Sequence, residues 1–365
     1  MTHRLHLVVM PGDGIGPEIT AATLRVLREA DRLLSLGLSF EEVPIGLAAL
    51  KAHGSTLPDA SFEAARRADG VILGPVSHNA YPPLAQGGLN PSGELRRRLD
   101  LYANIRPART RPRLAPRCGK SVDLVVVREN TEGFYADRNM YQGAADIMPT
   151  PDLAISLRKI SRAGSTRIAE SAFRLAMTRP RRKVAAVHKA NVLRVSDGLF
   201  LECVRAVADR HPQIAYEERI VDAMAALLVR DASAFDVIVT TNMFGDILSD
   251  EAAEIAGGLG LAASLNAGDT HAVAQAQHGS APDIAGQDRA NPTSLIASAA
   301  MLLAWLGERR RDDRLAPAAV LIERALDETL KRPQWRTADL GGPLGTQAFG
   351  ARVADTLATL PPPTP

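Results

Sequence analysis

The chain has 365 residues, of which 46% are hydrophobic and 23% are charged, and its formal net charge is +2. This length suits two domains of ordinary size, and the near-neutral charge argues against a dedicated nucleic-acid or membrane-surface binder. Only Cys118 and Cys203 occur, without the spacing of a thiolate metal site or a disulfide framework. The first apolar run is too short for a signal peptide or a membrane span. We therefore expect a cytoplasmic protein.

The predicted elements begin with a strand at residues 5–10, a glycine-rich turn at 11–18 and a helix at roughly 18–30. The glycines at 12, 14 and 16 lack the G-x-G-x-x-G spacing of a Rossmann pyrophosphate turn, so no dinucleotide site is predicted there. Strands then alternate with helices, which predicts an α/β fold with a largely parallel sheet. These strands are 71–73, 124–127, 184–187 and 237–239; these helices are 60–68, 165–177 and 197–209. After residue 250 the strand signal fades, and helices are predicted at 293–306 and 318–331.

Two carboxylates share one face of the helix that is predicted from Asp246 onward, just past a buried strand. Asp246 and Asp250 are four residues apart and so lie on the same side of a helix. Such a pair is most often a solvated surface feature, at a cost of about 0.2–0.5 kcal/mol. The functional alternative is half of an all-oxygen site for Mg²⁺ or Mn²⁺. Other residues must decide between the two.

Four basic side chains are candidates for binding or chemistry: Arg96, Arg106, Arg128 and Lys189. Arg128 and Lys189 each follow a buried strand, at the carboxyl end where α/β proteins place ligands. A guanidinium pairs carboxylates bidentately, and a lysine near cations or a metal can lose its proton near neutral pH and act as a base. The alternatives are a surface ion pair for each arginine, which we favour for Arg96 and Arg106 taken singly, and an ordinary exposed lysine for Lys189.

Six segments together resemble one family, the metal-dependent decarboxylating 2-hydroxyacid dehydrogenases that act on isocitrate, homoisocitrate, 3-isopropylmalate and tartrate. In family order they are 12–18, 101–107, 128–133, 188–191, 240–254 and 278–286. The resemblance implies the isopropylmalate/isocitrate dehydrogenase-like two-domain α/β fold, not the Rossmann fold. Residues 1–101 and 257–365 would form a large, cofactor-side domain. Residues 102–256 would form a small domain that makes a homodimer and carries the metal and catalytic residues.

The resemblance also implies roles for individual residues, in active sites that two subunits share. Asp246 and Asp250 would bind Mg²⁺ or Mn²⁺ together with Asp222 of the partner subunit, and Tyr135 and Lys189 would be the acid–base pair, with Lys189 entering from the partner. The metal would lower the pKa of the 2-hydroxyl and stabilise the charge left when CO₂ departs. Lys189 would relay the hydroxyl proton, and Tyr135 would protonate the carbon. A 2-hydroxy di- or tricarboxylate substrate would be bound by Asn90, Ser92, Arg96, Arg106, Arg128 and Asn191.

For the cofactor, the resemblance assigns the adenosine half to His278, Gly279, Ser280, Ala281, Asp283, Ile284 and Asn291. Asp283 favours NAD, because a carboxylate accepts hydrogen bonds from the ribose hydroxyls but repels a 2′-phosphate. The NADP-using branch carries Lys and Tyr at the positions of Asp283 and Ile284. Gln275 is a departure, since many members have Glu there, and Arg289 is close enough in sequence to approach a 2′-phosphate.

Substrate choice in this family depends on the residues just before Arg96. The isopropylmalate branch has adjacent leucines where this chain has Ser92 and Gly93. The homoisocitrate branch can carry an Arg in place of Gly93, and the isocitrate branch has Ser and Asn where Asn90 and Ser92 stand. A polar pocket suits a carboxylate or hydroxyl side group better than an alkyl group. We expect isocitrate or homoisocitrate, with 3-isopropylmalate, tartrate and D-malate as alternatives.

Two other classes of function stay open. Some subunits of hetero-oligomeric isocitrate dehydrogenases regulate without catalysing, but this chain retains Tyr135, Lys189 and all three aspartates. A metal-dependent carbon–carbon lyase without nicotinamide is disfavoured by residues 278–284. The sequence therefore predicts an NAD-dependent enzyme.

Overall fold

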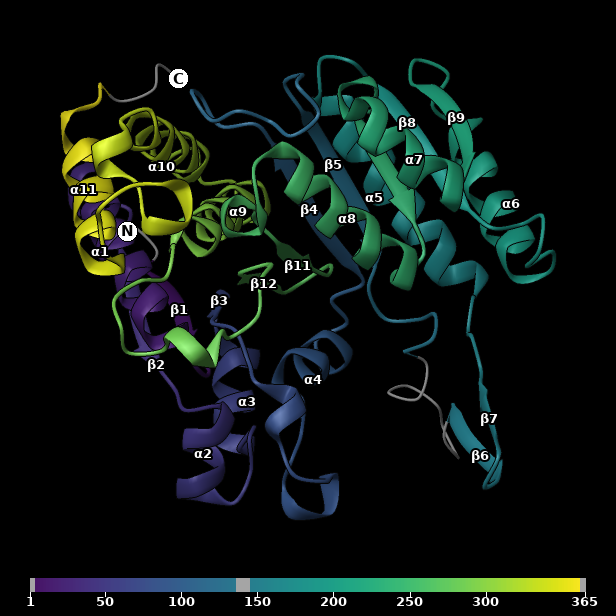
Figure 1. Cartoon of the computed structure of the whole chain (residues 1–365), viewed down its shortest axis with the longest axis horizontal. Helices are drawn as coiled ribbons and strands as arrows, with labels where there is room; N and C mark the ends of the chain where they lie inside the picture. Colours follow the sequence, from purple (N-terminus) through teal and green to yellow (C-terminus); the bar gives the residue numbers. More distant parts are fainter. Residues whose placement is uncertain (1–3, 136–144, 362–365) are drawn as a thin grey trace.

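The structure, a computed structural model, describes residues 4–135 and 145–361. Within this part of the chain one ten-stranded sheet runs through the molecule in the order β2-β1-β3-β12-β11-β4-β5-β10-β8-β9 (Figure 1). Its strands are β1 (Leu5–Met10), β2 (Leu38–Glu42), β3 (Gly70–Leu73), β4 (Ala103–Arg109), β5 (Asp123–Glu129), β8 (Lys183–His188), β9 (Ala215–Ile220), β10 (Val237–Thr240), β11 (Leu265–Ala267) and β12 (Ala272–Gln275). Neighbours pair in parallel except β11 with β12, β11 with β4 and β4 with β5. The prediction of a largely parallel sheet is confirmed.

One half of the sheet, from β2 to β11, is covered by helices from both ends of the chain. In β1, Leu7 and Val9 join the core on one face, whereas Val8 and Met10 join the core on the other, as the alternation of side chains along a strand requires. The first face is covered by α1 (Gly16–Leu34), α9 (Thr293–Arg310), α10 (Leu315–Leu330) and α11 (Thr346–Thr359). The second face is covered by α3 (Asp59–Arg67) and α4 (Pro91–Arg98), and α2 (Gly46–His53) precedes α3 in the chain.

The other half of the sheet, from β4 to β9, has two cores of its own. Helices α5 (Arg162–Thr178) and α6 (Ser196–Ala208) pack on the face that carries Val125, Val127 and Val239. Helices α7 (Val221–Asp231) and α8 (Asn242–Ala256) pack on the opposite face, against Val126 and Ile238. The predicted division of the chain near residues 102 and 256 follows this grouping of the cores and stays a prediction.

A hairpin of β6 (Asp146–Thr150) and β7 (Leu153–Ser156) forms a separate antiparallel sheet that projects from the body (Figure 1). Its strands carry exposed apolar side chains, among them Ile147, Met148, Leu153 and Ile155. In the described ranges, none of the helices is both long and apolar enough to cross a membrane.

Each predicted strand and helix is present, with ends that differ by a few residues. Helix α8 begins at Asn242, four residues before the predicted start. The expectation that strands fade after residue 250 is wrong, because β11 and β12 fill the gap between β3 and β4. These strands are three and four residues long and rich in alanine. Pairing with their neighbours, and not an apolar pattern of their own, makes them strands.

The glycine-rich turn at residues 11–18 is a structural brace. The Asp13 carboxylate accepts hydrogen bonds from the backbone N–H groups of Leu47 (2.7 Å) and Ser77 (2.9 Å) and from the Tyr81 hydroxyl. At the start of α1, Glu18 accepts hydrogen bonds from the backbone N–H groups of Gly286 and of Asp288, the latter at 3.0 Å. The turn therefore ties α1 to the segment that was predicted to bind adenosine.

Candidate active site

A cavity of about 260 Å³ lies where α4, α8, β12 and the loop after β12 meet, and many charged and polar side chains line it, beside Pro75, Val76 and Ala276. It contains many of the predicted substrate, catalytic and cofactor residues: Asn90, Ser92, Arg96, Arg106, Arg128, Tyr135, Asp246, His278 and Gly279. A larger cavity of about 490 Å³ lies beside Pro107 and Arg109 of β4, and none of the predicted site residues lines it. We therefore take the smaller cavity as the candidate site.

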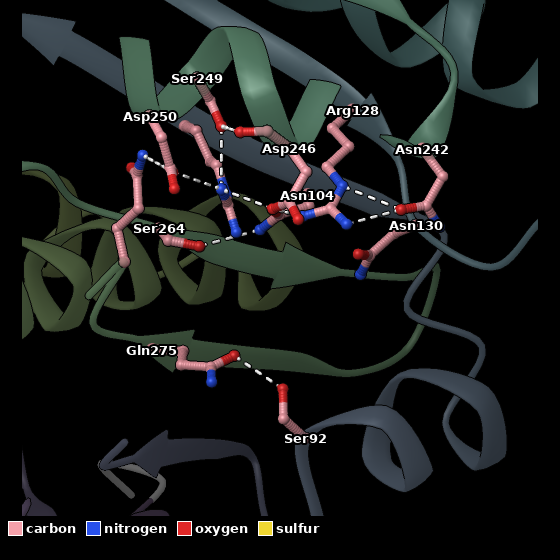
Figure 2. Close-up of polar contacts among 12 residues, drawn as sticks. Ser92, Asn104, Arg128, Asn130, Asn242, Asp246, Ser249, Asp250, Ser264 and Gln275 are labelled. Carbon is pink, nitrogen blue, oxygen red and sulfur yellow. Dashed lines mark hydrogen bonds and ion pairs between the residues drawn. The ribbon is translucent and has the colours of Figure 1, made fainter. Parts of the chain in front are cut away.

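Helix α8 presents its acidic face to two arginines of the central strands (Figure 2). Arg106 of β4 donates to Asp246 Oδ1 (3.2 Å), to Asp250 Oδ1 (3.1 Å) and to Ser249 Oγ (2.8 Å). Arg128 of β5 donates to Asp246 Oδ1 as well. The Arg106 side chain is 7% exposed and that of Arg128 is 2% exposed, so the interpretation of Arg106 as a surface ion pair is wrong. The acidic pair likewise faces buried cations, which excludes a purely solvated surface feature.

Burial and neighbouring charges shift the pKa values of Arg106 and Asp246. Burial and, to a smaller extent, the neighbouring Arg128 lower the pKa of Arg106 to about 10 against the opposing effect of the aspartates. Arg106 nevertheless remains a cation at neutral pH. Burial tends to raise the pKa of Asp246, but the fields of Arg128, Arg106 and Arg96 outweigh that effect and hold it below its usual value. Asp246 is therefore ionised at neutral pH and available to a cation.

Close packing of α8 against β5 brings Arg128 into position. A Cβ at Gly245 would lie 2.6 Å from Arg128 Cγ, so a larger residue there would push the arginine away. Asn242 Oδ1 accepts from Arg128 Nε (3.0 Å) and Nη2 (2.6 Å). Asn242 and Ser249 were not among the predicted site residues. Asn242 lies four residues before Asp246, and this helical spacing was the signal that could have found it.

The cavity wall formed by α4 is polar at its N-terminus. Asn90 is the N-cap, and its side chain accepts from the backbone N–H of Gly93 at 3.1 Å. Gln275 Oε1 at the end of β12 accepts from Ser92 Oγ at 3.0 Å (Figure 2). It also accepts from Arg96 Nη2 (3.3 Å) and from Asn266 Nδ2 (3.2 Å). Gln275 therefore connects the segment predicted to select the substrate to the sheet.

Tyr135 stands at the edge of the same cavity. Its hydroxyl lies 3.5 Å from Asp246 Oδ2, and the Arg128 guanidinium lies 5.8 Å from the centre of its ring. Gln277, which was not among the predicted site residues, donates to Asp250 Oδ1 at 2.8 Å. The arginine contacts therefore involve Oδ1 of Asp246 and of Asp250, whereas the Tyr135 contact involves Oδ2 of Asp246.

Lys189, Asn191 and Asp222 do not line this cavity. Lys189 follows β8 and Asp222 lies in the first turn of α7, and the two form an ion pair with 2.5 Å between Nζ and Oδ1. Asp222 is 69% exposed, and pairing with Lys189 holds its pKa below the usual value. Among residues 4–135 and 145–361, no group of three or more His, Cys, Asp or Glu side chains could hold a metal within one chain.

The two aspartates of α8 nevertheless have the chemistry of a divalent-cation site. Both are carboxylates, the ligands that Mg²⁺ and Mn²⁺ prefer, and their Oδ1 atoms are the ones that contact Arg106. The Tyr135 hydroxyl is the group that the structure places near Asp246 Oδ2, at 3.5 Å. The Asp246 and Asp250 side chains are 38% and 48% exposed, so both are accessible, although of the two only Asp246 lines the cavity. The residues fit a cation that is completed by substrate, water and a further carboxylate.

The predicted adenosine segment leads away from the cavity along the loop after β12. His278 and Gly279 line the cavity, and burial lowers the pKa of His278, which favours the neutral ring. Ser280 Oγ lies 2.7 Å from Ser77 Oγ, and Ala281 has a left-handed backbone with φ of 38°. The next residues, Pro282–Ile284, form a single 3₁₀ turn on which Asp283 is exposed.

At the end of this segment the side chains are already engaged by the protein. Asn291 donates to Asp339 Oδ2 and accepts from the backbone N–H of Thr293, both at 3.0 Å. Arg289 donates weakly to Gln287 at 3.4 Å. The roles that the resemblance gives Asn291 and Arg289 stay predictions.

The family assignment follows from comparison with known proteins. The family model for isocitrate/isopropylmalate dehydrogenases matches residues 6–353, so the chain belongs to that family. The mixed α/β architecture with a large central sheet is the isocitrate dehydrogenase fold, which confirms the predicted fold class. Its activity is that of a decarboxylating hydroxyacid dehydrogenase.

Individual relatives cover nearly the whole chain. The isocitrate/homoisocitrate dehydrogenase of Thermus thermophilus is 43% identical over 360 residues, covering 99% of this chain and all of the relative. The 3-isopropylmalate dehydrogenase of Sulfurisphaera tokodaii is 41% identical over 92% of this chain and 94% of its own length. The crystal structure of isocitrate dehydrogenase from Methylococcus capsulatus superposes with a TM-score of 0.86 at 38% identity, over 97% of this chain and 99% of that one.

Proposed function

We propose that the protein catalyses the NAD-dependent, divalent-metal-dependent oxidative decarboxylation of isocitrate or homoisocitrate. The observation that carries the proposal is the cavity in which Arg96, Arg106 and Arg128 meet Asp246. Three guanidiniums suit a substrate with several carboxylates, and a carboxylate beside them suits a cation that the substrate also binds. The same cavity would therefore bind both the anionic substrate and the metal cation.

The polar wall at α4 supports a charged substrate side group. Ser92 and Gly93 stand at the N-terminus of α4, and Asn90, Ser92 and Gln275 present oxygen and nitrogen atoms to the cavity. An isopropyl group is recognised by burial against apolar walls, and Ser92 and Gly93 place no large apolar side chain on this wall. A carboxylate on the substrate would instead meet the positive charge of Arg96.

The chain's own residues would divide the reaction between them. Arg106 and Arg128, held rigidly by Asp246 and Asn242, would orient the substrate carboxylates. Asp246 and Asp250 would hold the metal, and the segment from His278 to Asn291 would hold NAD. When bound, the metal supplies a Lewis acid for the 2-hydroxyl and NAD supplies a hydride acceptor. Lys189 would accept the hydroxyl proton, and the Tyr135 hydroxyl would give a proton to the carbon that loses CO₂.

This division of roles requires a second copy of the chain. Lys189 and Asp222 lie together outside the cavity, whereas the aspartates of α8 need a third carboxylate. Exposed apolar side chains lie close to Lys189 and Asp246 in the sequence: Val192 (66% exposed), Val195 (88%) and Ile247 (58%). Apolar exposure of this kind favours burial against another protein surface. We propose a homodimer in which each site receives Lys189 and Asp222 from the partner.

The substrate is tested by a panel of isocitrate, homoisocitrate, 3-isopropylmalate, tartrate and D-malate, each with NAD and Mn²⁺ and read as NADH formation. The highest kcat/KM with isocitrate or homoisocitrate is the expected result. The second candidate is 3-isopropylmalate, which the Sulfurisphaera tokodaii relative favours, and the highest kcat/KM with that compound would replace our assignment. Product formation without NADH would instead indicate a lyase.

The shared site is tested by mixing two inactive variants, Lys189→Ala and Asp250→Asn. A mixed dimer would contain one site in which both positions are wild type, so activity should return on mixing. If subunit exchange is verified and no activity returns, Lys189 and Asp250 do not serve one site from different chains. The cytoplasmic setting also stays a prediction, with which the free thiols of Cys118 and Cys203 agree.

A further inference from the structure

Arg158 lies at a junction between the start of α6 and the start of α8. Its Nη1 donates to Ser196 Oγ at 3.1 Å and pairs with the Asp197 carboxylate. Its Nη2 donates to Thr241 Oγ1 at 2.9 Å. Thr241 is the N-cap residue of α8, yet its side chain makes no capping hydrogen bond to the helix. The hydroxyl that would ordinarily cap α8 is bonded to Arg158.

Through Asp197 the same arginine reaches the Lys189 loop. Asp197 Oδ2 accepts from the backbone N–H of Lys189 at 2.6 Å, while Oδ1 pairs with Arg158. The Asp197 side chain is fully buried, and that of Arg158 is 8% exposed. The backbone position of Lys189 is therefore set by a buried ion pair whose other member contacts α8.

Arg158 also touches the turn that carries Tyr135. Its Cζ lies 5.9 Å from the centre of the Phe134 ring and 5.3 Å from that of Phe244, within the range of a cation–π contact. Phe134 immediately precedes Tyr135, and Phe244 is in the first turn of α8, two residues before Asp246. One side chain thus contacts all three segments that carry the proposed proton donor, base and metal ligands.

Local electrostatics do not favour a cation at this place. The N-terminus of a helix carries partial positive charge, and Arg158 approaches the N-termini of both α6 and α8. The Asp197 carboxylate offsets this repulsion. Two apolar side chains in place of Arg158 and Asp197 could, however, fill the same space without any buried charge. A buried arginine beside two helix N-termini is locally unfavourable, and its presence here therefore points to a functional role.

We propose that Arg158 is a positioning residue that fixes the Lys189 loop, the Tyr135 turn and α8 relative to one another. This inference rests on the proposed function, in which a subunit presents Tyr135 and Asp246 to its own site and Lys189 to the partner's site. Arg158 then links the two sites of the dimer mechanically, because the groups that it holds in one subunit serve both. It touches no substrate and acts only through the residues that it holds.

The first test separates kcat from KM. Arg158→Met is expected to lower kcat by about tenfold to a hundredfold, as misplacement of reacting groups by about 1 Å does, with KM for the substrate changed little. Arg158→Lys should be intermediate, because an ammonium lacks the planar fork that reaches Asp197 and Thr241 together. Arg162→Met is the matched control, since Arg162 is 61% exposed and its guanidinium contacts Glu202 and Cys203 of α6.

A second variant removes the effect of an unpaired buried charge. Arg158→Met combined with Asp197→Asn eliminates both charges and keeps an acceptor for the Lys189 N–H. Its thermal midpoint is expected to be closer to that of wild type than the midpoint of Arg158→Met is, while its kcat stays low. If this double variant recovered both the wild-type kcat and the wild-type thermal midpoint, Arg158 would serve stability only, and the proposal would be overturned.

Mixed dimers locate the effect. When Asp250→Asn and Lys189→Ala subunits are combined, the active site takes Lys189 from the first and Tyr135 and Asp246 from the second. Arg158→Met placed in either subunit should lower the restored kcat. A loss in only one placement, or in neither, would overturn the two-site role. Absence of NADH formation by the wild type, or of any restored activity, would instead refute the proposed function on which the inference rests.

Discussion

Replacement of Glu18 by Ala should weaken NADH binding although Glu18 lies outside the cavity. Its carboxylate accepts two hydrogen bonds from the backbone of the cofactor loop, at Gly286 and Asp288. A hydrogen bond to a charged group contributes about 1.5–3 kcal/mol, and because both donors lie near the surface we take the lower value, which gives about 3 kcal/mol for the pair. Without these bonds the loop must be ordered when the cofactor binds, so the cost appears in the dissociation constant.

A factor of ten in the dissociation constant corresponds to about 1.4 kcal/mol, so loss of the full 3 kcal/mol would weaken NADH binding roughly a hundredfold. Water can solvate the freed N–H groups and so reduce this loss, and we therefore expect binding that is about tenfold to a hundredfold weaker. Titration of NADH by fluorescence measures the dissociation constant, and amide hydrogen exchange of residues 278–291 measures the order of the loop. Glu18→Gln should be intermediate, because an amide oxygen lacks the charge.

Glu29→Gln is the control, since Glu29 on the same helix pairs with Arg32 and not with the loop. If Glu18→Ala binds NADH as wild type does and its loop exchanges at the wild-type rate, the bracing role assigned to the glycine-rich turn is refuted.

Three further predictions concern the metal, the cofactor and pH. Asp246→Asn should keep the fold by circular dichroism but retain under about 1% of the activity, because loss of a charged metal ligand costs several kcal/mol of transition-state stabilisation; full turnover of the wild type in excess chelator would contradict this. Asp283→Lys combined with Ile284→Tyr should raise the NADP-to-NAD ratio of kcat/KM by roughly a hundredfold, since exchanging a repulsive for an attractive charge near a phosphate is worth about 2–3 kcal/mol; equal values for both cofactors in wild type would show that Asp283 does not face the ribose. Burial lowers the pKa of His188, whose Nδ1 accepts from the Ala190 N–H at 3.0 Å; the unfolded chain then binds more protons below about pH 6.5, so the free energy of unfolding should fall from pH 7 to pH 5. Urea denaturation should show a smaller fall for His188→Asn, and an identical fall would refute the assignment.

Much of the fold could be predicted because buried parallel strands have continuous apolar sequences. Val184–Val187 and Val237–Val239 are of this kind, and each is followed by a helix of regular spacing. Strands β11 and β12 could not be found in this way. Leu265–Ala267 and Ala272–Gln275 are short and contain few β-branched residues, and their conformation depends on β3 and β4, which are distant in the sequence.

The candidate site was predictable where chemistry coincides with an element boundary, as for Arg128 at the end of β5 and Asp246 on α8. Arg106 was harder to assign, because burial in the middle of the sheet depends on the partners of β4 and not on its own sequence. The contacts of Gln277 and Gln275 likewise arise from residues far apart along the chain. Polar residues of this kind have no periodic signal, and only the folded arrangement shows which of them face a charge.

The half-sheet that contains β1 has consequences for synthesis of the chain. Its core combines α1 with α9, α10 and α11, so the first helix meets its packing partners only after the intervening segment has left the ribosome. Those roughly 250 residues take on the order of ten to fifty seconds to translate. Throughout that interval the apolar side of α1 has no native cover, whereas the segment from β4 to α8 can complete its two cores as soon as it emerges. The nascent chain should therefore depend on chaperones at its N-terminus, and a circular permutant that begins at β4 should depend on them less.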